Sequence, residues 1–129
     1  MSIIVYAEGG HPSAVGDLLR VVRSKASREH IEMIDSFDGL KERLRRLPRR
    51  INAAVLLAAT HDGLAGLVSL REFLSDTPLI LILPDQEKGT IAQASRLCPK
   101  FTSTVDSDFN VVGAVLGRML ELWGTRAVG

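Results

Sequence analysis

Two nearly continuous apolar segments in the middle of the chain constrain its fold more than any other feature. Residues 52–59 read NAAVLLAA and residues 78–84 read PLILILP. Neither shows the alternation of apolar and polar residues that marks a strand with one solvent-exposed face. Strands that are buried on both faces have this composition, and they are typical of parallel sheets with helices on each side. Both segments are therefore expected to be central strands of a parallel sheet.

Strand-like and helix-like segments alternate along the whole chain. The strand-like segments are residues 2–7, 30–35, 52–59, 78–84 and 100–106, and the segments that follow them have apolar residues at helical spacing. Strict alternation predicts a parallel sheet with right-handed crossovers. Five units are too few for a closed eight-stranded barrel. The pattern thus predicts an α/β fold, a three-layer αβα sandwich, in one domain spanning residues 1–129.

Composition excludes several classes of protein. Sixteen Lys and Arg residues oppose fifteen Asp and Glu residues, so the net charge of +1 creates no strong field toward nucleic acid or a membrane. Apolar runs such as LILILP are far shorter than the roughly 20 residues of a membrane span. Cys98 is the single cysteine, which excludes an internal disulfide, and it is expected to be a packed thiol. A cytoplasmic protein without a membrane segment is expected.

Acidic residues follow the predicted strands. In open doubly wound sheets, ligands gather at the carboxyl ends of the strands, so these residues form a possible acidic pocket for a divalent cation. Its members are Glu8, Asp62, Asp85, Asp106 and Asp108. The favoured interpretation is that Asp62, Asp108 and also Asp85 cap helix N-termini. No metal and no cofactor are expected. His61 lacks a surrounding catalytic or metal-ligand pattern and is interpreted as a loop histidine.

Three segments of the chain resemble the receiver domains of bacterial two-component response regulators, and the resemblance extends over essentially the whole length. They are AAVLLA followed by HDGLAGLVSLREFL, then TPLILILPD, and finally FTSTVDSDF. The resemblance implies a flavodoxin-like, CheY-like fold with strand order 2-1-3-4-5 and a role in signal transduction. It also implies a phosphoryl switch, in which carboxylates after strand one hold Mg²⁺ and an aspartate, a hydroxyl residue and a lysine end strands three, four and five.

The sequence departs from this switch at each of its positions. They fall on Glu8 in place of an acidic pair, on Ala58 at the phosphoacceptor position, on Leu83 before Pro84, and on Asp106 or Ser107. The chain is therefore interpreted as a pseudo-receiver, not an enzyme, which acts in bacterial signalling through protein–protein contacts and independently of aspartyl phosphorylation. The alternative is a flavodoxin-like domain that binds a small ligand, a nucleotide or a divalent cation through the acidic residues at its strand ends.

A basic segment, KERLRRLPRR at residues 41–50, is the one concentration of charge. Its possible basic patch consists of Arg43, Arg45, Arg46, Arg49 and Arg50. Leucines at helical spacing already assign one face of this helix to the core, so the arginines are interpreted as its solvated side. An acidic protein partner is the alternative. Nucleic acid is not expected as a partner, because no aromatic residues are interleaved to stack on bases.

The last predicted helix has an unusually wide apolar face. At about 100° per residue its apolar side chains cover an arc of about 180°, wider than the stripe of roughly 100° that faces a core. The possible interface consists of Val111, Val115, Leu120, Leu122 and Trp123, and Gly113 and Gly117 flank it. A homodimer or a complex with a protein partner through this helix is therefore expected. The alternative is that the wide face packs against both the sheet and the first helix.

Overall fold

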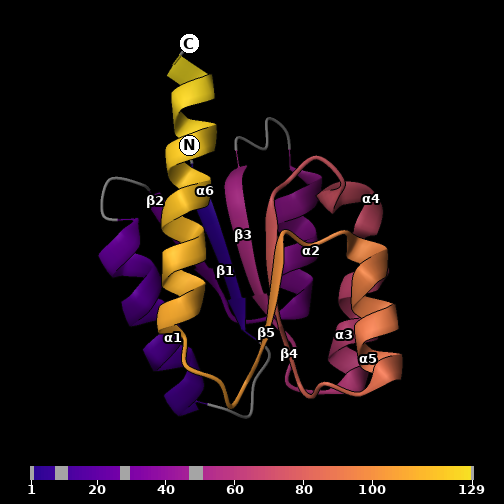
Figure 1. Cartoon of the computed structure of the whole chain (residues 1–129). Coiled ribbons are helices and arrows are strands. Elements are labelled where there is room, and N and C mark those ends of the chain that lie inside the picture. The colour runs from indigo at the N-terminus through magenta and orange to yellow at the C-terminus, as the bar shows by residue number, and fades with distance from the viewer. Residues whose placement is uncertain (1, 8–11, 27–29, 47–50, 129) are drawn as a thin grey trace.

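Five strands form one parallel sheet in the order β2-β1-β3-β4-β5 (Figure 1). The computed structural model describes the backbone of residues 2–7, 12–26, 30–46 and 51–128, and the side chains of these ranges except at residues 12–13 and 122–128. The strands are β1 Ser2–Ala7, β2 His30–Ile34, β3 Ile51–Leu57, β4 Leu79–Leu83 and β5 Phe101–Thr104. The predicted fold class, strand order and central position of β3 and β4 are confirmed.

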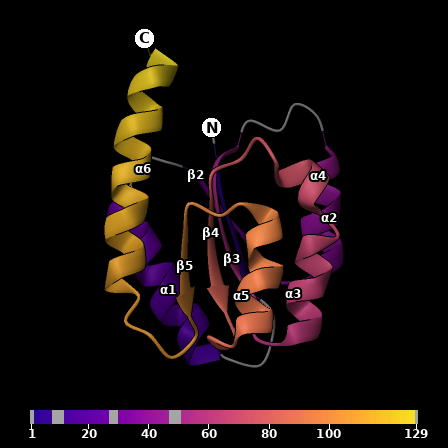
Figure 2. The ribbon, with the colours of Figure 1, turned by 45° about the vertical axis from the view of Figure 1, so that its right-hand side comes forward.

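Helices cover both faces of the sheet (Figures 1 and 2). One face carries α1 Pro12–Lys25 and α6 Asn110–Val128, and the other carries α2 Phe37–Arg45, α3 His61–Val68, α4 Arg71–Leu74 and α5 Lys88–Ala94, which continues into the 3-10 turn η1 Ser95–Leu97. Within the described ranges, no helix combines the length and the apolar character that a membrane span requires.

The central strands bury side chains on both of their faces. Successive residues of a strand point to opposite sides, so Ala54 and Leu56 of β3 join the core beneath α2 to α5, whereas Val55 and Leu57 join the core beneath α1 and α6. All four are inaccessible to solvent. This two-sided burial is the reason why the apolar segments show no alternation with polar residues.

The structure differs from the sequence-based expectations in the segment after β3 and in the burial of Cys98. The segment after β3 was expected to be one helix, but it divides into α3 and α4 at Ser69 and Leu70. The N–H of Leu70 donates to the carbonyl of Leu67, three residues back, which tightens the end of α3 and closes it. Cys98 follows η1 with a positive φ of 51° and is exposed, so the expectation of a packed thiol is wrong.

Candidate functional site

The carboxyl end of β3 holds a side chain without a functional group. Ala58 directly follows the strand, is 1% exposed, and donates its backbone N–H to the carbonyl of Ile82 at 2.8 Å. Its methyl group belongs to the core beneath α2 to α5. At the carboxyl end of the central strand β3, the side chain of Ala58 therefore contributes to core packing and offers no group for chemistry.

A polar cluster lies beside Ala58, between the start of α3 and the loop after β4. His61 Nε2 is 2.6 Å from Asp85 Oδ2, and the hydroxyl of Thr90 donates to Asp85 Oδ1 at 2.6 Å. The backbone N–H of Glu87 donates to the same Oδ1 at 3.0 Å. We call His61, Asp85, Glu87 and Thr90 the His61 cluster. It joins the ends of two neighbouring strands.

Local sequence explains how each part of the His61 cluster is positioned. Thr60 caps α3, since its hydroxyl accepts the N–H of Gly63 at 3.0 Å, and this fixes His61 as the first residue of the helix. His61 was interpreted as a loop histidine, and that interpretation is wrong. No local pattern links His61 to Asp85, which lies 24 residues further along the chain. β3 and β4 are parallel neighbours in the sheet, so their carboxyl ends lie side by side. This pairing could have indicated that His61 and Asp85 meet.

The pKa shifts of the cluster follow from these contacts. The Thr90 hydroxyl, the Glu87 N–H and His61 together hold the pKa of Asp85 below its ordinary value, with the Thr90 hydrogen bond having the largest effect. The hydrogen bond to Asp85 raises the pKa of His61, and the charges of Asp85, Glu87 and Asp62 raise it further. The side chains of His61 and Asp85 are 59% and 31% exposed, so solvent screens their attraction.

The five acidic residues of the predicted pocket do not form one group. Among the described residues, only His61, Asp85 and Glu87 offer three potential metal-ligating atoms within 4.8 Å of one another. Asp62 lies in the first turn of α3 and stays outside this group, and Glu8 lies outside the described residues. The structure therefore replaces the predicted pocket by a smaller cluster that contains a histidine.

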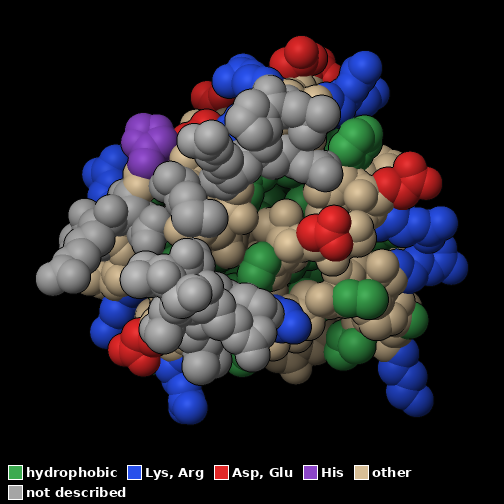
Figure 3. Space-filling view, turned by 90° about the horizontal axis from the view of Figure 1, so that it is seen from above, with side chains coloured by type: hydrophobic (Ala, Val, Ile, Leu, Met, Phe, Trp, Pro, Cys, Tyr) green, Lys and Arg blue, Asp and Glu red, His purple; other side chains and the backbone are tan. Residues whose placement is uncertain are grey.

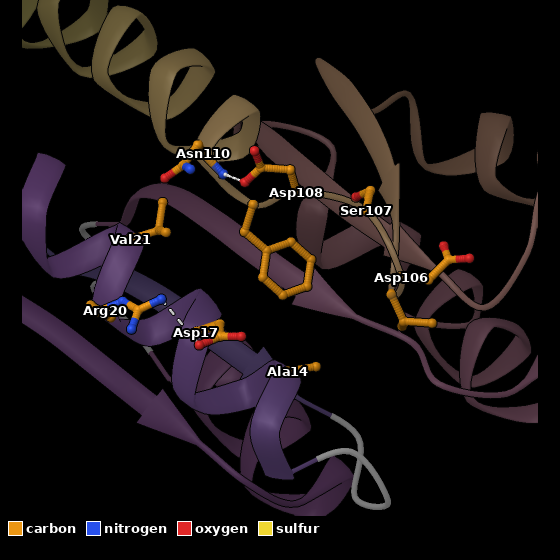
Figure 4. A pocket seen from close by; sticks show the side chains of 10 residues that line it. Ala14, Asp17, Arg20, Val21, Asp106, Ser107, Asp108 and Asn110 are labelled. Atoms are coloured by element: carbon orange, nitrogen blue, oxygen red, sulfur yellow. Dashed lines mark hydrogen bonds and ion pairs between the residues drawn. The ribbon is translucent and has the colours of Figure 1, made fainter.

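Asp106 and Asp108 line a separate hollow between the β5–α6 loop and α1 (Figure 4). Its volume is about 360 Å³. Asp108 accepts the N–H of Asn110 at 2.9 Å, which is the predicted capping role, and Asp106 accepts the hydroxyl of Thr104 at 2.7 Å. Figure 4 shows the Asp106 carboxylate pointing away from Asp17 and Asp108. These carboxylates thus stabilise their own loop and do not converge on one point.

Comparison with solved structures identifies similar folds. The chain superimposes on a response regulator receiver domain protein from Methanospirillum hungatei JF-1 with a TM-score of 0.72, at 8% identity and over 97% of each chain. It superimposes on the phosphorylated cyanobacterial phytochrome response regulator RcpA with a TM-score of 0.69, at 11% identity, over 95% of this chain and 92% of that one. The chain has the receiver-domain fold.

A further similar structure is a putative pilus assembly-related protein from Burkholderia pseudomallei K96243. It matches with a TM-score of 0.67 at 17% identity, over 92% of this chain and 88% of that one. No protein-family model matches the sequence, and no curated protein matches it at a significant level. The similarity therefore lies in the receiver fold.

The ends of β4 and β5 also lack the hydroxyl residue and the lysine that the resemblance to receiver domains implies at these positions. Leu83 ends β4, is 2% exposed and packs in the core, and Pro84 follows it. Lys100 lies at the opposite end of β5, where its N–H donates to the carbonyl of Leu79, the first residue of β4. Asp106 and Ser107 follow the carboxyl end of β5, and both are exposed.

The predicted basic patch is divided by an ion pair. Arg43 lies against Glu32 of β2 and is only 12% exposed, so it is not part of a solvated basic face. Arg45 and Arg46 are exposed, whereas Arg49 and Arg50 lie outside the described residues. Figure 3 views the end of the molecule at which the strands begin, where most of the coloured Lys and Arg side chains lie around the rim and acidic side chains lie among them.

In the part of α6 whose side chains the structure describes, most of the wide apolar face packs against the sheet and α1. Gly113 is buried, and a Cβ at this position would overlap the Val21 side chain of α1. Val115 and Leu120 are half-buried against the same core, whereas Val111 is 51% exposed. The side chains of Leu122 and Trp123 lie outside those that the structure describes. Packing against both the sheet and α1, the alternative interpretation of this helix, accounts for most of the described face.

Proposed function

We propose that this chain is a pseudo-receiver, a non-catalytic signalling domain that acts through protein contacts and independently of aspartyl phosphorylation. The main support is Ala58. Phosphoryl transfer to a receiver requires a nucleophilic oxygen at the end of the third strand, and a buried methyl group has none. A role in two-component signal transduction is in keeping with the receiver fold.

The neighbouring strand ends support the same proposal. An in-line displacement at phosphorus needs cationic groups to neutralise the developing charge. After β5 the chain presents Asp106 and Ser107, and Asp106 would repel a phosphoryl group, while Lys100 lies at the far end of that strand. Leu83 offers no hydroxyl group at the end of β4.

Phosphorylation can be tested directly. The chain is incubated with acetyl phosphate and Mg²⁺ and examined by intact mass spectrometry, with a receiver that is known to be phosphorylated as the positive control. No adduct is expected. Beryllofluoride with Mg²⁺ is expected to leave the amide NMR spectrum unchanged. A stoichiometric, acid-labile phosphoryl adduct would contradict the proposal.

We further propose that the partner surface is the β5 edge of the sheet with the helices on either side. β5 is the last strand of the sheet, and it lies between α5 and α6 (Figure 2). Ile91 on α5 and Val111 on α6 are each 51% exposed, which makes them the most exposed large apolar side chains in the described part of the chain. Receiver-like proteins commonly pair through this region, and a second copy of the chain is the partner proposed here.

Sedimentation velocity at micromolar concentration tests this surface. The wild type is expected to sediment as a dimer and Val111→Glu as a monomer. Met33→Glu is the matched control, because Met33 is 38% exposed on β2 at the other edge of the sheet and should leave the dimer intact. Leu120→Glu is less informative, since Leu120 packs partly against the core. A monomeric wild type would contradict the homodimer.

A further inference from the structure

Three side chains of the His61 cluster carry atoms that can ligate a metal ion. His61 contributes an imidazole nitrogen from the start of α3, and Asp85 and Glu87 contribute carboxylate oxygens from the loop between β4 and α5. These atoms lie within 4.8 Å of one another. Ligand atoms that share one ion at about 2.0–2.2 Å are roughly 3–4 Å apart, so small side-chain rotations that separate His61 Nε2 from Asp85 Oδ2 would make room for an ion.

Asp85 is held in place before any ion binds. Thr90 is only 4% exposed, and its hydroxyl donates to Asp85 Oδ1 at 2.6 Å. The backbone N–H of Glu87 donates to the same oxygen at 3.0 Å. The other oxygen, Oδ2, is directed at His61 Nε2 at 2.6 Å. Hydrogen bonds of this kind to a ligating carboxylate orient it and raise metal affinity.

We propose that His61, Asp85 and Glu87 bind one divalent transition-metal ion of the zinc class. One imidazole and two carboxylates suit Zn²⁺ and its neighbours better than Mg²⁺, which prefers oxygen ligands alone. The ion takes the place of the proton between His61 Nε2 and Asp85 Oδ2. Because His61 and Glu87 are exposed, water completes the coordination. The site is independent of the pseudo-receiver proposal, since it uses none of the phosphorylation positions.

Isothermal titration with ZnCl₂ tests the site. The titration uses the Cys98→Ser background, because Cys98 is an exposed thiol that would bind zinc by itself. One ion per chain is expected. His61→Asn should weaken binding at least tenfold, and Glu87→Gln should weaken it less.

The matched control is His30→Asn, because His30 is an exposed histidine of β2 at the far edge of the sheet. This variant should bind Zn²⁺ with the same affinity as the Cys98→Ser background. Titration of the background with MgCl₂ should give no saturable heat. Circular dichroism of each variant verifies that it is folded. Absence of saturable zinc binding, or undiminished affinity in folded His61→Asn, would overturn the proposal.

Discussion

Arg43 of α2 donates two parallel hydrogen bonds to the carboxylate of Glu32 on the edge strand β2. Arg43 Nε donates to Oε1 and Nη2 donates to Oε2, each at 2.9 Å. The two side chains are 12% and 24% exposed, so solvent screens this pair less than an ordinary surface ion pair. Such bidentate, charge-assisted contacts are among the stronger hydrogen bonds in proteins. The Glu32–Arg43 ion pair therefore stabilises the packing of α2 against the edge strand of the sheet.

Replacing Glu32 by Gln should lower the free energy of unfolding by about 1–3 kcal/mol, because it leaves the Arg43 guanidinium without its charged partner. Urea denaturation measures the change. Asp17→Asn is the matched control, since Asp17 pairs with Arg20 at 3.1 Å while the two side chains are 57% and 77% exposed. That change should cost less than about 0.5 kcal/mol. Equal losses in the two variants would refute the assigned role of the Glu32–Arg43 pair.

The stability contributed by Glu32 should depend on pH in the acid range. The hydrogen bond from Arg43 holds the pKa of Glu32 below its ordinary value of 4.5 in the folded protein. As pH falls, the unfolded chain therefore takes up this proton first. The contribution is fully present above the unfolded-state pKa and disappears as pH falls through the folded-state pKa. The difference in unfolding free energy between wild type and Glu32→Gln should shrink below pH 4.5. A constant difference between pH 7 and pH 3 would argue against this linkage.

Gly113→Ala should destabilise the protein although alanine favours helix. A Cβ at Gly113 would overlap Val21 of α1, so the close approach of α1 and α6 requires glycine there. Overpacking of this kind costs about 1–3 kcal/mol. Gly16→Ala on α1 is the control, because nothing lies within 4 Å of its Cβ position, and this change should stabilise by about 0.5–1 kcal/mol. Thermal denaturation that ranks the two variants the other way would show that the helices do not meet at Gly113.

The double variant Val21→Ala, Gly113→Ala should lose less unfolding free energy than the sum of the losses in the two single variants. The smaller side chain at position 21 removes the atom that the new Cβ would overlap. A double-mutant cycle measures this coupling. Additive effects would place the cost of Gly113→Ala elsewhere in the helix.

Truncation in the central strands should be costly on both faces of the sheet. Leu56 of β3 and Ile80 of β4 are both fully buried, and they belong to different core clusters. Leu56→Ala and Ile80→Ala should each lower the free energy of unfolding by about 2–5 kcal/mol. Thr102→Ala on the exposed side of β5 is the control and should have a small effect. Losses well below 2 kcal/mol would contradict two-sided burial of these strands.

Hydrophobic pattern determined the architecture because it is a local property that repeats with the period of each element. The apolar runs at residues 52–59 and 78–84 predicted central strands, and the structure confirms them as β3 and β4. Alternation of strands and helices predicted the αβα layers. The absence of a nucleophile at Ala58 is likewise visible in the sequence, since it depends on the identity of one residue at a strand end.

Tertiary structure alone decided which polar side chains meet. Asp62, Asp85, Asp106 and Asp108 all follow strands or begin helices, yet only Asp85 joins His61 and Glu87, because side-chain direction depends on how α3 and the β4–α5 loop dock. Arg43 was expected among solvated arginines, but Glu32 of the edge strand lies within its reach. Gly113 was expected to flank an interface with another chain, but α1 of the same chain covers it. Contacts between segments distant in sequence arise only when the elements pack, and no local pattern encodes them.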